Sequence, residues 1–206
     1  MIRGRYVIGL TGSIGMGKSV ASKMLRRCGV PVFDADAEVH KLMAKGGRAV
    51  RAVEAAFPGV TVDGAVNRPA LGAKVFGDSA ALKRLERILH PMVGRAERAF
   101  LARAARNRKK VVARDVPLLF ETGGDKRCDL TLVVSAPAHI QRWRVLARPG
   151  MTAERLAQVK AKQLPDAVKR RRADRVVPSG LGKRVTWTHI RRAVQAARAD
   201  AAGRRS

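Results

Sequence analysis

Residues 12–19 read GSIGMGKS, and this stretch constrains the chain more than any other part of its sequence. It follows the apolar run YVIGLT at residues 6–11 and precedes a helix-like stretch. Glycines in this pattern let backbone N–H groups converge on anionic oxygens, and the following helix adds the positive end of its dipole. The pattern predicts a phosphate-binding loop in which Lys18 contacts the β- and γ-phosphates of a nucleotide and the Ser19 hydroxyl binds Mg²⁺.

Five runs rich in apolar and β-branched residues predict the strands of one sheet. Several of these runs are almost continuously apolar rather than alternating, which is typical of parallel strands covered on both faces. Because helix-like stretches separate them, their order predicts an α/β fold with right-handed crossovers. The runs occupy residues 5–11, 30–36, 109–119, 129–136 and 174–180.

Residues 37–108 interrupt this alternation and contain no comparable strand. Apolar residues recur there at spacings of three and four, with Gly and Pro between the stretches. We therefore expect a helical subdomain inserted between the second and third strands. One of its apolar stripes consists of Leu82, Leu85, Ile88 and Leu89.

Residues 138–172, called the lid segment below, are helical in pattern and strongly basic. The break Arg-Pro-Gly at 148–150 suits a loop, and Thr152 is placed to begin the second helix of a pair. A basic, interrupted helical pair beside a phosphate site is typical of a closing lid. We expect one or two of its basic residues, near the lid hinge, to neutralise phosphate charge and most of them to form a solvated face. These residues are Arg142, Arg144, Arg148 and Lys169 to Arg172.

These segments together predict a single domain of 206 residues. The sheet and its covering helices form a core of about residues 5–36, 109–137 and 173–203. The inserted subdomain and the lid segment make up the rest of the domain.

Carboxylates stand where two of the strands end. Asp34 and Asp36 follow the second strand, and ligands of open α/β sheets bind outside the carboxyl ends of the strands. Asp36 could orient or deprotonate an attacking hydroxyl, hold Mg²⁺ through water, or cap the next helix. Asp115 ends the third strand, and Glu121 follows that strand. The sequence leaves open whether these carboxylates contribute to Mg²⁺ binding or have structural roles.

The dipeptide His90–Pro91 lies inside a helix-like stretch. A single His is more often a packed or surface residue than a catalytic one, although a kink at Pro91 could turn the ring inward. Both interpretations stay open on the sequence pattern alone.

The charge balance is extreme, since 43 Lys and Arg residues face 16 Asp and Glu residues for a net charge of +27. Such a field attracts phosphates and polyanions of every kind without selecting among them. Aromatic residues make up only 4% of the chain, which disfavours a stacking platform for single-stranded nucleic acid.

The two cysteines, Cys28 and Cys128, are far apart in the sequence and have no CxxC or histidine cluster beside them. This spacing disfavours a zinc site or a disulfide framework and is typical of a reducing cytoplasm. No apolar run reaches the roughly 18 residues that a membrane span requires. The first strand begins at about Tyr6, so removal of a targeting peptide would destroy the phosphate-binding loop.

Taken together, these motifs resemble the dephospho-coenzyme A kinase family, a branch of the P-loop kinases. Only the phosphate-binding loop is specific by itself, but the ordered set extends over nearly the whole chain. The matching segments are IGLTGSIGMGKS, FDAD, NRPALGAKVF, LERILHPMV, VPLLFE, VVSAPAHIQRWRVLAR, Gln163 and ADRVVPSGLG.

The resemblance implies ATP-dependent phosphorylation of the ribose 3′-hydroxyl of dephospho-coenzyme A, the last step of coenzyme A synthesis, with ATP and Mg²⁺ as the required ligands. Asp36 would face the attacking hydroxyl, while His90 and Pro91 would belong to the acceptor-binding subdomain. Arg144 would be catalytic together with Lys18 and Asp36, and Ser179 to Gly182 would lie near the adenine. The residues expected to bind ATP are Thr11, Gly12, Ser13, Ile14, Gly15, Met16, Gly17, Lys18, Ser19, Val20 and Arg148.

Three positions depart from the commoner family pattern. Val20 stands in place of a Thr, Pro149 changes the turn of the lid segment, and Ser179 stands where many relatives have Asn. Ser19 keeps the hydroxyl expected to bind Mg²⁺, so the loop should still function.

Two other functions compete with this interpretation. The same architecture could phosphorylate another small molecule, such as a nucleoside monophosphate, although the inserted subdomain and the LHP element favour the coenzyme A branch. A basic nucleic-acid-binding protein with ATP as a switch would explain the charge, but no recognisable nucleic-acid-reading motif supports it.

Overall fold

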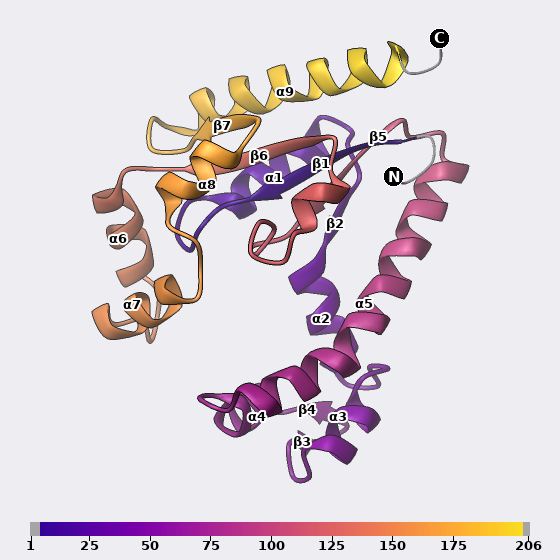
Figure 1. Cartoon of the computed structure of the whole chain (residues 1–206), viewed down its shortest axis with the longest axis vertical. Helices are drawn as coiled ribbons and strands as arrows, with labels where there is room; N and C mark the ends of the chain where they lie inside the picture. Colours follow the sequence, from indigo (N-terminus) through magenta and orange to yellow (C-terminus); the bar gives the residue numbers. More distant parts are fainter. Residues whose placement is uncertain (1–4, 204–206) are drawn as a thin grey trace. The chain divides into compact units, whose positions relative to one another are not determined.

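Five parallel strands form a sheet in the order β2-β5-β1-β6-β7 (Figure 1). The protein is described here by a computed structural model, in which residues 5–203 are placed well enough to describe. The sheet confirms the predicted α/β fold, although each of the five strands is shorter than its apolar run. They are β1 (Tyr6–Thr11), β2 (Val32–Asp34), β5 (Val111–Asp115), β6 (Leu130–Ser135) and β7 (Arg175–Pro178).

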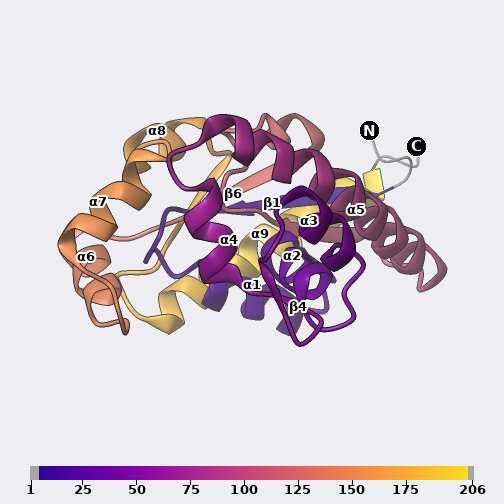
Figure 2. The same cartoon turned by 90° about the horizontal axis from the view of Figure 1, so that it is seen from below.

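The central strand β1 is buried along its whole length and carries side chains toward both faces of the sheet. Ile8 and Leu10 belong to the main core cluster, to which helices α1 (Lys18–Arg27) and α9 (Lys183–Gly203) contribute. On the opposite face, Leu119 and Cys128 lie against Gly9, and α8 (Asp166–Arg172) packs on β6. Figure 2 shows α1 and α9 on one side of β1 and β6 and α8 on the other, which gives three layers.

The chain divides into two compact units. The core unit contains residues 5–33 and 104–203 of the described chain, and the insert unit contains residues 34–103. The core unit also includes the 3₁₀ helix η1 and two more helices. These elements are η1 (Gly124–Arg127), α6 (Ala138–Leu146) and α7 (Ala153–Ala161).

The insert unit has its own hydrophobic core, built largely from Leu, Val and Ala side chains. Its helices follow the predicted apolar spacing, but it also contains a short antiparallel hairpin that the sequence analysis did not predict. The hairpin strands have only two residues each, too few to show a period of two. The elements are α2 (Ala35–Met43), α3 (Val50–Ala56), β3 (Thr61–Val62), β4 (Ala65–Val66), α4 (Arg68–Val75) and most of α5 (Ser79–Arg106).

Helix α5 continues through Pro91, whose ring removes one backbone donor without ending the helix. The predicted apolar stripe at its start is only partly right. Leu85 and Leu89 are buried in the core of the insert unit, and Ile88 packs against them, but Leu82 is 44% exposed.

The structure corrects the sequence analysis of two further segments. Asp36 does not extend strand β2 but lies in the first turn of α2, where Asp34 is the N-cap. The lid segment contains three helices, α6, α7 and α8, rather than a pair. Thr152 does begin a helix, because its hydroxyl accepts a hydrogen bond from the Arg155 N–H at the N-terminus of α7.

The contrast between Leu85 and Leu82 can be tested by substitution. Leu85→Ala leaves a cavity in the core of the insert unit and should lower the free energy of unfolding by about 2–5 kcal/mol. Leu82→Ala, three residues away on the same helix, should change it by less than about 0.5 kcal/mol. Urea denaturation followed by circular dichroism measures both. Equal losses would show that the two side chains share one environment.

Candidate active site

The loop between β1 and α1 is held tightly against helix α6. Gly15 has a φ of +76°, and a Cβ at this position would lie 2.5 Å from Val145 Cγ2. Gly17 is the N-cap of α1 with a φ of +88°, a left-handed conformation that suits glycine. The first N–H groups of α1 have no acceptor within the helix, so this end of the loop presents donors to an anion.

Lys18 forms an ion pair with Asp115, with 2.6 Å between Lys18 Nζ and Asp115 Oδ1. The lysine side chain is 17% exposed and that of the aspartate 2%. The pairing follows from the sheet, because β1 and β5 are neighbouring parallel strands and Leu10 lies opposite Asp115. The sequence marked Asp115 as a strand-end carboxylate but did not show its direct contact with the loop lysine.

Arg144 approaches the phosphate-binding loop through Ser179. Its guanidinium donates to the Ser179 hydroxyl at 3.1 Å and to the Ser179 carbonyl at 2.7 Å. The Ser179 hydroxyl in turn donates to the carbonyl of Met16 at 2.6 Å. The family resemblance implies that Ser179 lies near the adenine. The structure adds a contact, since this buried serine joins Arg144 to the loop.

Two glutamines of the lid segment hold Ile14 of the loop from both sides. The side-chain carbonyl of Gln163 accepts from the Ile14 N–H at 3.0 Å, and the Gln141 amide donates to the Ile14 carbonyl at 2.8 Å. Gln163 follows α7, whereas Gln141 lies on α6. The lid segment therefore contacts both the N–H group and the carbonyl group of Ile14 in the loop. Gln141 was not among the expected site residues.

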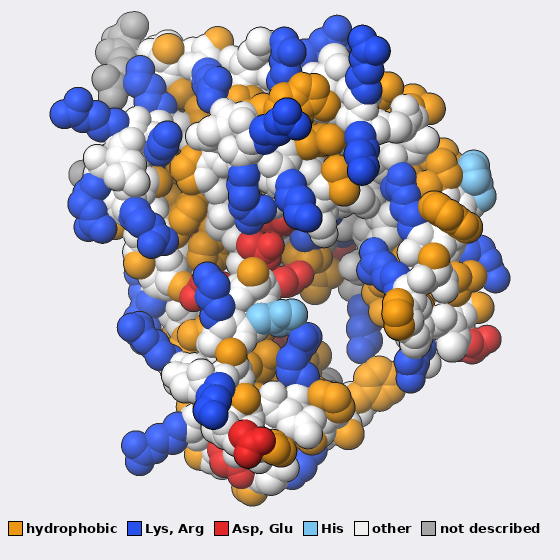
Figure 3. Space-filling view, turned by 180° about the vertical axis from the view of Figure 1, so that it is seen from behind, with side chains coloured by type: hydrophobic (Ala, Val, Ile, Leu, Met, Phe, Trp, Pro, Cys, Tyr) orange, Lys and Arg blue, Asp and Glu red, His pale blue; other side chains and the backbone are white. Residues whose placement is uncertain are grey.

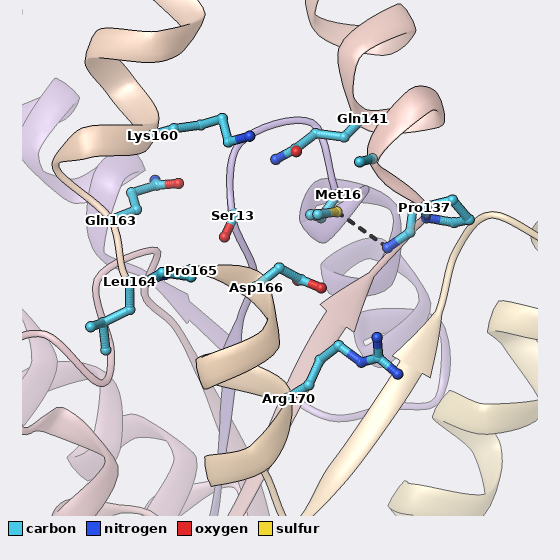
Figure 4. A pocket seen from close by; sticks show the side chains of 12 residues that line it. Ser13, Met16, Pro137, Gln141, Lys160, Gln163, Leu164, Pro165, Asp166 and Arg170 are labelled. Carbon is cyan, nitrogen blue, oxygen red and sulfur yellow. Dashed lines mark hydrogen bonds between the residues drawn. The ribbon is translucent and has the colours of Figure 1, made fainter.

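A cavity of about 290 Å³ lies between the loop and the lid segment (Figure 4). The side chain of Ser13 points toward it, and its buried hydroxyl has no hydrogen-bond partner among the described residues. On the same wall, Met16 Sδ accepts from the Ala136 N–H at 3.2 Å. Ser13 and Met16 of the loop therefore both line the cavity.

The remaining loop residues are placed as follows. Thr11 is buried, and its hydroxyl donates to the Pro117 carbonyl at 3.0 Å. Ser19 and Val20 are exposed in the first turn of α1. Arg148 is exposed in the turn after α6 and has no side-chain partner among the described residues.

A buried ion pair lies behind the loop and corrects the expectation of a solvated basic face in α8. Lys169 is fully buried and pairs with Glu121, with 2.9 Å between Nζ and Oε1. Burial alone would raise the pKa of Glu121, but hydrogen bonds from Lys169 and from the Leu164 N–H outweigh it and hold the pKa below the usual value of 4.5. The three arginines that follow Lys169 are exposed.

The other predicted residues belong to the insert unit. Asp34 accepts a hydrogen bond from the Ala37 N–H at 2.9 Å and thereby caps α2. Asp36 is exposed in the first turn of that helix, and His90 and Pro91 are exposed on α5. The structure brings Arg144 and the loop with Lys18 together in the core unit. Asp36, His90 and Pro91 all belong to the insert unit.

The loop, the strand order and the Lys18–Asp115 pair define a P-loop protein with a kinase fold. In solved structures, the fold is similar to that of TT1252 from Thermus thermophilus, with a TM-score of 0.81 and 34% identity over 94% of this chain and 98% of that one. A dephospho-CoA kinase from Campylobacter jejuni has the same fold, with a TM-score of 0.61 and 19% identity over 94% of this chain and 97% of that one.

Sequence comparison identifies the family. The profile of dephospho-CoA kinases matches residues 6–181. The dephospho-CoA kinase of Paramagnetospirillum magneticum is 68% identical over 164 residues, which cover 80% of this chain and 77% of that protein. That of Rhodospirillum rubrum is 59% identical over 186 residues, covering 90% and 88% respectively. The chain belongs to the dephospho-CoA kinase family, which confirms the predicted resemblance.

Lys and Arg side chains are scattered over the face seen in Figure 3 instead of forming one stripe, and Asp and Glu side chains are few there. Among residues 5–203, no helix is both long and apolar enough to cross a membrane.

The tight fit of the loop against α6 gives a prediction for Gly15. Gly15→Ala should weaken ATP binding at least about tenfold, because alanine is strained at positive φ and its methyl group would displace the loop from Val145. Gly72→Ala is the control, since a Cβ there meets nothing within 4 Å. Calorimetric titration with Mg-ATP measures both affinities. An unchanged Kd for Gly15→Ala would show that the loop tolerates a displacement there.

Proposed function

We propose that the protein transfers the γ-phosphoryl group of ATP to the ribose 3′-hydroxyl of dephospho-coenzyme A, giving coenzyme A and ADP. The observation that carries this proposal is the phosphate-binding loop, with Lys18 at its end, in a chain that belongs to the dephospho-CoA kinase family. The reaction needs positioned cations and donors more than covalent chemistry. The loop and the arginines of the lid segment supply such groups.

On the nucleotide side, we assign phosphate binding to the loop backbone from Thr11 to Val20 and to Lys18. Lys18 would exchange its contact with Asp115 for phosphate oxygens, or share its three donors between them. Arg144 already lies at the loop through Ser179, and its planar fork suits the neutralisation of phosphate charge. We assign a phosphate contact to Arg148 as well, whose side chain is exposed.

The residues at the loop fit a magnesium ion. The Ser19 hydroxyl is exposed at the start of α1. The Asp115 carboxylate contacts Lys18, the residue that precedes Ser19. Hydroxyl and carboxylate oxygens are the ligands that Mg²⁺ prefers. We propose that Ser19 binds the metal, which when bound neutralises charge on the phosphate oxygens.

On the acceptor side, we assign to Asp36 the task of orienting the attacking hydroxyl and accepting its proton. Its carboxylate is exposed and has no partner among the described residues, whereas that of the neighbouring Asp34 is engaged as a helix cap. We propose that the insert unit is the acceptor-binding subdomain and that His90 and Pro91 contribute to it. We also propose that residues 138–172 act as a lid.

We place this activity in the cytoplasm, because Cys28 and Cys128 are both free thiols. The basic surface would raise the local concentration of the two polyanionic substrates. We propose no specific nucleic-acid partner.

The proposal is tested by measuring ADP release from Mg-ATP with one acceptor at a time. Dephospho-coenzyme A should stimulate release strongly, whereas AMP, CMP and a generic RNA should not, and Lys18→Ala should remove the stimulation. The assay is run near physiological ionic strength, because nonspecific binding of polyanions falls steeply with salt. Stimulation by AMP or CMP would indicate a nucleoside monophosphate kinase, and stimulation by RNA would indicate a nucleic-acid-dependent ATPase.

Asp34, at the end of β2, and Asp36, in the first turn of α2, provide a matched pair of variants. Asp36→Asn should lower kcat by about 100-fold or more without changing the Kd for ATP, because it removes the proton acceptor and not a nucleotide contact. Asp34→Asn should retain nearly normal kcat, since asparagine caps a helix as well as aspartate does. Steady-state kinetics and ATP titration separate the two effects. A parallel loss of ATP affinity in Asp36→Asn would assign Asp36 to the metal or the nucleotide instead.

A further inference from the structure

Lys169 is the one lysine among the largest fully buried side chains of the described residues. Burying a charge is costly unless it is paired and hydrogen-bonded, so a lysine retained at such a position needs specific partners. Two acceptors lie within hydrogen-bond distance of its Nζ, the Glu121 carboxylate at 2.9 Å and the Pro117 carbonyl at 2.9 Å. Neither acceptor belongs to the phosphate-binding loop.

Each acceptor, however, leads to the loop in one further step. The Pro117 carbonyl also accepts from the hydroxyl of Thr11, at the end of β1 where the loop begins. Pro117 also follows Asp115, the partner of Lys18, by two residues. This branch connects Lys169 to the first residue of the loop and to the turn that carries Asp115.

The second branch passes through the lid segment. Glu121 Oε1, which pairs with Lys169, also accepts from the Leu164 N–H at 2.8 Å. The preceding residue, Gln163, accepts from the Ile14 N–H of the loop. Fixing the backbone at Leu164 therefore fixes the point from which Gln163 reaches the loop.

We propose that Lys169 is a positioning residue, which holds Glu121 so that Gln163 keeps the phosphate-binding loop in the geometry needed for phosphoryl transfer. Lys169 contacts no reacting group and acts through Glu121 and Gln163. Without the ammonium group, the Glu121 carboxylate would be a largely buried charge with no ionic partner and would turn toward solvent. The Leu164–Gln163 backbone would then lose its anchor.

The first test measures the loop directly and does not depend on the proposed function. Lys169→Met should speed hydrogen exchange of the Ile14 amide at least about tenfold in the protein without added ligands, because Gln163 protects that N–H. Arg171→Met removes the same charge from an exposed position on the same helix and should leave the exchange rate unchanged. NMR of the labelled protein measures both. An unchanged Ile14 rate in Lys169→Met would overturn the proposal.

The second test rests on the proposed kinase activity. Lys169→Met should lower kcat by about ten- to a hundred-fold, since small displacements of a positioning group have effects of that size. In a Gln163→Met background, the same substitution should lower kcat by less than about threefold, because the contact through which it acts is already lost. Equal factors in both backgrounds would mean that Lys169 supports the fold alone.

A third variant covers the case in which Lys169→Met does not fold. Lys169→Met with Glu121→Gln buries no unpaired carboxylate and should remain folded. It should still speed Ile14 exchange and lower kcat at least about tenfold, because the neutral amide at position 121, no longer held by the ammonium group, does not fix the Leu164 N–H from which Gln163 reaches the loop. Wild-type exchange and kcat in this folded variant would also overturn the proposal.

Discussion

The parallel pairing of β1 with both β5 and β6 is the constraint from which the rest of the site follows. Parallel neighbours end at the same edge of a sheet, so the loop after β1, Asp115 at the end of β5 and Ala136 after β6 meet there. Asp115 contacts Lys18, and the Ala136 N–H contacts Met16. The ends of two neighbouring strands therefore hold the loop, in addition to its contacts with the lid segment.

Features of the fold and the site could be predicted from the sequence where they depend on residues close together in the chain. The loop and its lysine follow from eight consecutive residues, and the α/β class follows from the spacing of apolar runs. The Lys18–Asp115 contact required the strand order, which joins residues 97 positions apart. Leu82 and Leu85 fit the same helical period, and only the packing of the insert unit shows that one is exposed and the other buried.

Lys169 shows why burial of a charge is hard to infer from a run of like charges. It is the first of four consecutive basic residues, and nothing in the sequence separates it from the three exposed arginines. Its burial becomes intelligible only beside Glu121, 48 residues earlier, and the Pro117 carbonyl. A buried ion pair adds little to net stability, but it tolerates few alternative arrangements. Such a pair suits a role in fixing geometry at the loop.

The use of acidic residues bears on the assignment of Asp36. With only 16 Asp and Glu against 43 Lys and Arg, most carboxylates in this chain are engaged as structural acceptors. Asp34 and Asp78 accept backbone N–H groups at helix starts, Asp129 and Asp174 accept backbone N–H groups of strands, and Asp115 and Glu121 neutralise buried or half-buried lysines. Asp36 is among the few whose carboxylate has no partner among the described residues, and it lies in the first turn of α2, the helix that follows β2. We therefore propose that the exposed carboxylate of Asp36 contacts a ligand at this end of the sheet.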